Sequence, residues 1–145
     1  MKIHYITTDL EFESTENLDP IVQELGDAIV PQLNQWVDKT YRVSLSGTGS
    51  ELNFGPEQTI SEFCGLIERL SESSQSLWHG CMKRVADIGF ESGSEPNHLT
   101  CHLPAYLISR LEKLKIELAI TIYPIDICDY DHNDKKHNKI NAADR

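Results

Sequence analysis

The stretch Lys83-Arg84-Val85-Ala86-Asp87-Ile88-Gly89-Phe90-Glu91 determines how the rest of the chain can fold. Its second half alternates strictly between apolar and polar or small residues, which is the pattern of a half-buried β-strand. Gly89 lies on the polar side, and a glycine inside a strand marks a bulge or a place where another backbone comes close. We therefore interpret this stretch as a central strand of a sheet.

The length and composition indicate one folded domain. A chain of 145 residues with 39% hydrophobic and 25% charged residues can bury a core without a metal or a disulfide. We predict a single α+β domain over 1–128 and a polar tail over 129–145, where four acidic residues balance four basic ones. The sequence has neither an apolar run of membrane-spanning length nor a signal peptide, so we expect a cytoplasmic protein.

The net charge of −10 is concentrated in the folded part of the chain. Up to Asp38 the sequence has eight acidic residues and one basic residue, Lys2. Such a field repels nucleic acid and anionic membranes and attracts basic proteins. The alternative interpretation is that the charge only keeps the protein in solution.

The cysteines and histidines do not form a recognisable metal or redox motif. Cys64, Cys81, Cys101 and Cys128 are each isolated in the sequence, which favours reduced thiols. His98 and His102 flank Cys101, but in an extended strand the two histidines would be about 13 Å apart and could not share a metal ion. The glycine-rich segment 47–50 is not followed by a phosphate-binding lysine. We predict no metal and no cofactor.

Hydrophobic periodicity predicts the other elements. Strands are predicted over 2–14, 41–46, 98–103 and 116–123, and helices from Asp19-Pro20, over 55–70, as a short turn around Leu77-Trp78, and from Pro104. The segment 31–39 could be a short helix or an extended segment, of which we favour the helix. Residues 98–103 are interpreted as the hairpin partner of the central strand. This order predicts an α+β fold, with a mainly antiparallel, mixed sheet of about five strands and helices packed on one face.

Acidic residues recur on the side of the strands that faces away from the predicted core. In the first strand such carboxylates are about 7 Å apart and repel one another unless a cation or water is present, so we interpret this strand as an edge that binds a partner. The predicted partner-binding residues are Asp9, Glu11, Glu13, Asp87, Glu91 and Glu117.

Three parts of the sequence together resemble a family of small bacterial α/β proteins. They are Leu18-Asp19-Pro20-Ile21, Leu77-Trp78 with Arg84 to Glu91, and Leu118 to Tyr123. Some members of that family accompany polymorphic or contact-dependent growth-inhibition toxins as immunity proteins. The resemblance covers roughly 8–123 and implies a fold, with no site residues to carry over. Ala86 departs from it, because a larger apolar residue is usual there.

The resemblance and the acidity lead to one functional hypothesis and two alternatives. The first is an immunity protein that binds and neutralises a cognate toxin without catalysis. The second is a small enzyme or ligand-binding protein that uses His79, His98 or His102 with Asp87 or Glu91. The third is a structural module that forms a homodimer through an exposed sheet edge. A deep cavity shared by a histidine and a carboxylate would favour the second hypothesis, and an open acidic surface the first.

Overall fold

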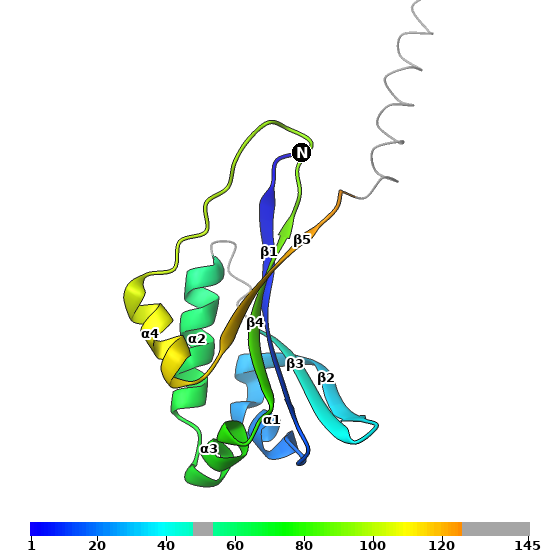
Figure 1. Cartoon of the computed structure of the whole chain (residues 1–145), viewed down its shortest axis with the longest axis vertical. Coiled ribbons are helices and arrows are strands. Elements are labelled where there is room, and N and C mark those ends of the chain that lie inside the picture. The colour runs from blue at the N-terminus through cyan, green and yellow to red at the C-terminus, as the bar shows by residue number, and fades with distance from the viewer. Residues whose placement is uncertain (48–53, 126–145) are drawn as a thin grey trace, which may run out of the picture.

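The computed structural model describes residues 1–47 and 54–125, which form five strands and four α-helices (Figure 1). The strands are β1 (His4–Ser14), β2 (Ile29–Val37), β3 (Thr40–Gly47), β4 (Lys83–Glu91) and β5 (Glu117–Tyr123). The helices are α1 (Asp19–Leu25), which a 3₁₀ turn (Gly26–Ala28) follows, α2 (Pro56–Glu68), α3 (Glu72–His79) and α4 (Ala105–Lys113). The fold is α+β, as predicted.

The strands form one mixed sheet in the order β2-β3-β1-β4-β5. All neighbouring strands are antiparallel except β4 and β5, which are parallel because α4 lies between them in the chain. The stretch 83–91 is an interior strand, and β1 occupies the middle of the sheet. The expectation that the first strand forms an edge is therefore wrong, because β3 and β4 pair with its two sides.

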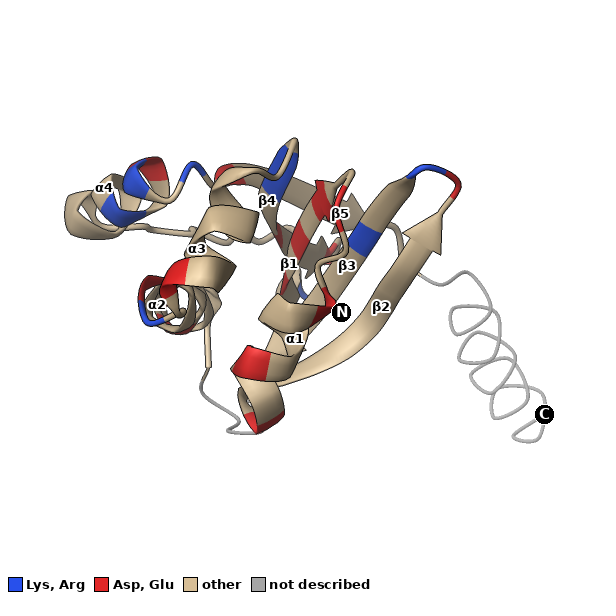
Figure 2. Ribbon diagram, turned by 90° about the horizontal axis from the view of Figure 1, so that it is seen from below, with Lys and Arg blue, Asp and Glu red and all other residues tan. Residues whose placement is uncertain are grey.

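The helices lie on one side of the sheet, and the core is between them and the strands (Figures 1 and 2). Trp78 from α3 is fully buried, and its ring packs edge-on against Phe12 of β1 with 5.1 Å between the ring centroids. Its indole Nε1 donates a hydrogen bond to the carbonyl oxygen of Leu114. Arg84 donates to the carbonyl oxygens of Trp78 and Cys81, so β4 satisfies the C-terminal end of α3.

Residues 31–39 form no helix, in contrast to the prediction. They belong to the edge strand β2 and to the turn that leads into β3. Pro31 is compatible with this position because an edge strand has one side without hydrogen-bonded neighbours, and the register shifts between Pro31 and Leu33. Most residues of β2 are at least partly exposed, which explains why its sequence lacks clear alternation.

The predicted hairpin after β4 is also wrong. Residues 98–103 alternate in polarity, but the segment that joins β4 to α4 is irregular. β4 already has β1 on one side and β5 on the other, so no edge of β4 remains for a hairpin partner. In addition, α3 begins at Glu72, earlier than predicted, because Ser71 caps it by accepting a hydrogen bond from the backbone N–H of Ser74.

Gly89 lies opposite an irregularity in the pairing of β1 with β4. A Cβ atom at this position would lie 3.4 Å from the carbonyl oxygen of Thr7 and 3.4 Å from the ring of Tyr123. The neighbouring strand β1 shifts register between Tyr5 and Thr7, directly opposite Gly89. This register shift is the kind of irregularity that a glycine inside a strand predicts, whereas the two distances are ordinary van der Waals contacts.

Three further predictions concern the cysteines, the tail and membrane spans. Cys64, Cys81 and Cys101 are free thiols, whereas Cys128 and the predicted tail over 129–145 lie outside the described residues. Burial raises the pKa of both Cys64 and Cys81 to about 11, which keeps these thiols protonated at neutral pH. No helix in the described part of the chain is long and apolar enough to cross a membrane.

Candidate functional site: the open face of the sheet

The sheet face that the helices leave uncovered, which we call the open face, carries all six predicted partner-binding carboxylates. Bridged residues of neighbouring strands share a face, and the register places Asp9 opposite Asp87, and Glu117 opposite Val85. On β1 and β4 these residues alternate with core residues. The open-face residues are Asp9, Glu11 and Glu13 on β1, Asp87 and Glu91 on β4, and Glu117 on β5.

Two of the six carboxylates have basic neighbours on the open face. Glu13 lies 3.6 Å from Arg42 of β3 and 3.8 Å from Lys83 of β4, and Glu11 lies 3.7 Å from the same lysine. Figure 2 shows the corresponding basic bands on β3 and β4 beside the acidic bands of β1. The set of six predicted partner-binding carboxylates is therefore partly neutralised at the end of the sheet near the start of β4.

The other part of the open face centres on Asp9 and Asp87, which we call the aspartate pair. The two residues are directly opposite each other on neighbouring strands, a position where Cβ atoms are about 4.5–5.5 Å apart. Ser46 donates a hydrogen bond to Asp9 over 2.8 Å, and Thr121 donates to both oxygens of Asp87 over 2.8 and 3.0 Å. Hydroxyl groups thus orient both carboxylates without neutralising their charge.

The aspartate pair is the place on the open face where two carboxylates lie directly opposite each other. Like charges opposite each other on neighbouring strands destabilise a sheet. Within the part of the chain that the structure describes, neither aspartate forms an ion pair, and no group of three or more His, Cys, Asp or Glu side chains could hold a metal ion. A guanidinium or ammonium group from a partner would relieve the repulsion between the two carboxylates.

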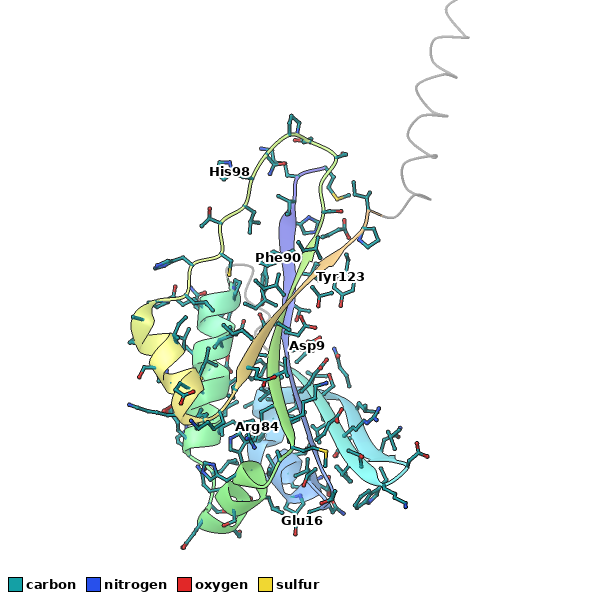
Figure 3. The ribbon with its side chains drawn as sticks, in the orientation of Figure 1. Asp9, Glu16, Arg84, Phe90, His98 and Tyr123 are labelled. Carbon is teal, nitrogen blue, oxygen red and sulfur yellow. The ribbon has the colours of Figure 1, made fainter. Side chains whose placement is uncertain are left out.

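The histidines of the enzyme hypothesis lie apart from its carboxylates. Asp87 is on the open face, whereas His98 and His102 belong to the irregular segment between β4 and α4 (Figure 3). His102 lines a cavity of about 260 Å³ together with Cys101 and Glu57. Burial raises the pKa of the Cys101 thiol, which disfavours the nucleophilic thiolate. No histidine among the described residues is hydrogen-bonded to a carboxylate, so this cavity lacks the base-and-carboxylate contact that a catalytic pair would use.

Residues 98–103 have an irregular backbone and form no extended strand. The separation of about 13 Å between His98 and His102, which was predicted for a strand, therefore does not apply.

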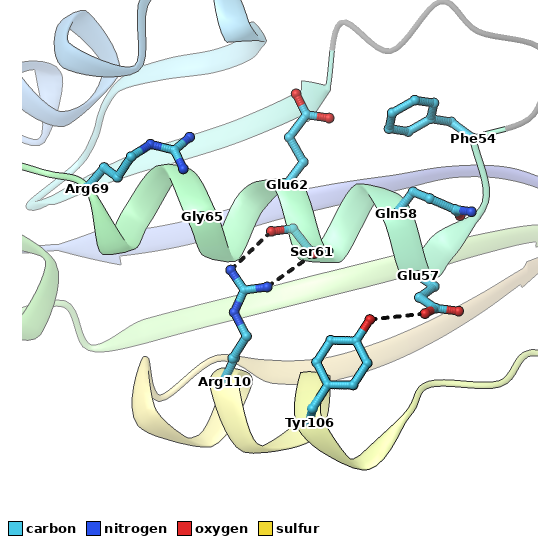
Figure 4. A pocket seen from close by; sticks show the side chains of 9 residues that line it. All are labelled: Phe54, Glu57, Gln58, Ser61, Glu62, Gly65, Arg69, Tyr106 and Arg110. Atoms are coloured by element: carbon cyan, nitrogen blue, oxygen red, sulfur yellow. Dashed lines mark hydrogen bonds between the residues drawn. The ribbon is translucent and has the colours of Figure 1, made fainter.

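A second concave region lies between α2 and α4 and measures about 550 Å³ (Figure 4). Arg110 of α4 crosses it, donating to the hydroxyl of Ser61 over 3.1 Å and pairing with Glu68. Tyr106 donates to Glu57 over 3.3 Å. Because these polar groups already satisfy one another, the contacts join α4 to α2, and we assign them a structural role.

Sequence reasoning found which side chains face away from the core but missed how they are grouped. The alternation in each strand indicated the open-face residues, whereas the pairing of β1 with β3 and β4 brings Arg42 and Lys83 to Glu13. The hydroxyl donors Ser46 and Thr121 were missed for the same reason. The only available signal was that each occupies a polar position in an alternating strand.

Comparisons with known proteins add no assignment: no family model, no curated protein and no solved structure matches this chain.

Proposed function

We propose that this protein is an immunity protein that binds a cognate bacterial toxin through the open face of its sheet. The observation that carries the proposal is the aspartate pair, Asp9 and Asp87, which places two opposed carboxylates on an uncovered sheet face without an ion-pair partner among the described residues. Toxins that cut or bind nucleic acid present basic residues to their substrate. An acidic surface that covers such residues would block the toxin without any chemical step.

The electrostatics of the whole chain support the same proposal. A net charge of −10 accelerates the encounter with a basic partner, and the local charges then determine the orientation of binding. Ser46 and Thr121 hold the two carboxylates in place before binding, so little side-chain freedom remains to be lost when a toxin arginine or lysine inserts between them.

The direct test asks whether a gene adjacent to the one for this protein encodes a toxin domain, and uses that domain as the binding partner. We expect the purified proteins to form a complex and expect co-expression to restore the growth of cells that produce the toxin. The Asp9→Asn and Asp87→Asn double variant should associate at least about fivefold more slowly at low salt, because it removes two charges at the contact. Stopped-flow measurements at two ionic strengths should show that the difference shrinks as salt screens the field.

A matched control removes the same charge from the helix side. Glu62→Gln on α2 with Glu72→Gln on α3 changes the net charge equally but leaves the open face intact. This control should associate at nearly the wild-type rate. Absence of both binding and growth rescue with the wild-type protein would refute the proposed function. Equal slowing by the two double variants would instead show that only the net charge matters.

A further inference from the structure

We infer that the free edge of β5 pairs with β5 of a second copy of this chain, forming an antiparallel dimer with a continuous ten-stranded sheet. This inference goes beyond toxin binding and uses a different surface. It rests on three observations. The strand is exposed, its outward backbone groups are free within the described residues, and an antiparallel second copy places apolar residues opposite apolar residues.

The two edges of the sheet differ in how they are protected. β2 carries Pro31 and a register shift in its middle, both of which obstruct the addition of another strand. β5 contains no proline and no register shift, and its one charged residue, Glu117, is at its start. Within the described residues no strand pairs with the outer side of β5. An apolar edge without protection is a template for another strand.

The side chains on the helix-facing side of β5 are apolar and uncovered. Leu118, Ile120 and Ile122 are 41%, 64% and 60% exposed, although their neighbours Ala86, Ile88 and Phe90 on β4 are buried. Figures 1 and 3 show the reason, because β5 runs away from α2 and α4 towards Tyr123. Three successive positions on the helix-facing side thus form an apolar row that residues 1–47 and 54–125 leave exposed.

The backbone direction selects the same three residues for pairing. The carbonyl oxygen of Tyr123 accepts a hydrogen bond from the N–H of Ser92, so Tyr123 turns its polar groups towards β4. In a strand the N–H and C=O of one residue point to the same side, and the next residue points to the opposite side. Leu118, Ile120 and Ile122 therefore present their N–H and C=O groups to the free edge.

Only one register lets the outward N–H and C=O groups of Leu118, Ile120 and Ile122 all form hydrogen bonds with a second copy. Antiparallel pairing with Ile120 on the two-fold axis places Ile120 opposite its own copy and Leu118 opposite Ile122 of the second copy. These are the hydrogen-bonded positions of an antiparallel ladder, so all three outward-facing residues obtain partners. On the opposite face Glu117 meets Tyr123, so no like charges are opposed.

Other occupants of the edge fit less well. From Asp129 to Arg145 the sequence has Ile140 as its one branched aliphatic residue, which cannot match a row of three. A basic partner would be attracted to the open face and has no charge to meet on the apolar row. A second copy supplies the same row in the required order, as a two-fold interface demands.

The test is the oligomeric state of the full chain. Analytical ultracentrifugation up to about 500 µM should show a concentration-dependent species of twice the chain mass of 16.5 kDa. A seven-residue strand makes a small interface, so we expect a dissociation constant on the order of 10–100 µM. Because both copies are acidic, added salt should strengthen the dimer, whereas it should weaken toxin binding. Failure of one proposal is thus distinguishable from failure of the other.

Two variants with the same chemical change locate the contact. Ile120→Lys places two lysines at the two-fold axis and should abolish the dimer at every concentration tested. Ile108→Lys on α4, at a side chain that is 48% exposed, should leave it unchanged. A circular dichroism melt of each variant checks that it is folded.

Hydrogen exchange at the amides of Leu118, Ile120 and Ile122 distinguishes a second copy from the chain's own residues. In the dimer these amides become protected as protein concentration rises. Protection at concentrations where the protein is monomeric would show that another part of the same chain covers the edge and would overturn the inference. A wild-type monomer at the highest concentration, or a dimer that survives Ile120→Lys, would also overturn it.

Discussion

The two faces of the sheet differ in how their side chains affect stability. On the helix side Leu10, Phe12 and Ile88 are at most 1% exposed and belong to the hydrophobic core. On the open face, Asp9 and Asp87 directly precede Leu10 and Ile88, and their like charges lie opposite each other on neighbouring strands. Burial of apolar area stabilises the first arrangement, whereas the second costs stability. A residue that opposes stability without a structural benefit indicates a function outside the folded chain itself.

The largest effect is expected on the helix side. Trp78→Ala removes a fully buried ring, its edge-on contact with Phe12 and the hydrogen bond to Leu114. The free energy of unfolding should fall by about 3–5 kcal/mol. Urea denaturation followed by circular dichroism measures this change.

The second tryptophan provides the control for this prediction. Trp36 on β2 also makes an edge-on ring contact, with Tyr41 at 5.3 Å, but it is 49% exposed. Trp36→Ala should cost no more than about 1.5 kcal/mol, since most of its area is already in water. Similar losses for the two variants would contradict the view that the core lies on the helix side alone.

Neutralising the aspartate pair should raise the free energy of unfolding, whereas the tryptophan substitutions lower it. Asp9→Asn or Asp87→Asn keeps an acceptor for Ser46 or Thr121 and removes the repulsion between two opposed carboxylates. Each single variant should raise the free energy of unfolding by about 0.2–1 kcal/mol at neutral pH and low salt. The double variant should gain little more, because the first substitution already removes the repulsion.

The neighbouring carboxylates test whether this gain is specific. Glu13→Gln removes a carboxylate that lies between Arg42 and Lys83, so its stability should stay the same or fall slightly. If Glu13→Gln stabilised the protein as much as Asp87→Asn, the net charge and not the aspartate pair would be the cause. Thermal melts of the three variants in low salt decide between the two explanations.

Periodicity in the sequence predicted individual helices and strands well, but it did not predict which strands pair. β5, α2 and α4 were identified because their alternation or helical spacing is continuous. β2 was missed because an edge strand has no buried side to produce alternation. The segment 98–103 has alternation but no strand, because both edges of β4 are occupied. Alternation therefore predicts a strand reliably only where a neighbouring strand has a free edge with which the segment can pair.

The candidate site, too, was predicted from the sequence only in part. The six carboxylates could be assigned to the outward side of their strands from sequence, since side-chain direction has a period of two. Their pairing depends on contacts between residues more than 70 positions apart, such as Asp9 with Asp87. The neutralisation of Glu11 and Glu13 by Lys83 also comes from this pairing. No local pattern contains that information.

The smallest expected effect concerns Glu24, a helix-side carboxylate that, unlike the aspartate pair, has many donors. The hydroxyl of Ser74, the backbone N–H of Ser71 and the hydroxyl of Ser71 all donate to it, which connects α1 to the start of α3. Led by the Ser74 hydroxyl, these bonds lower the pKa of Glu24 from its ordinary value of 4.5.

Because the pKa of Glu24 is lower in the folded state, its ionised form stabilises the protein above pH 4.5, and this contribution is lost as pH falls through the folded-state value. Glu24→Gln should therefore lower the melting temperature near neutral pH by less than Trp78→Ala does, and the difference from wild type should vanish in strong acid. Ser74→Ala should reproduce this pH dependence, and combining it with Glu24→Gln should add little, because both remove the same contact. Melting temperatures recorded from neutral pH to about pH 3 measure the effect. A difference between Glu24→Gln and wild type that stays constant over this range would show that the Glu24 charge does not hold α1 to α3.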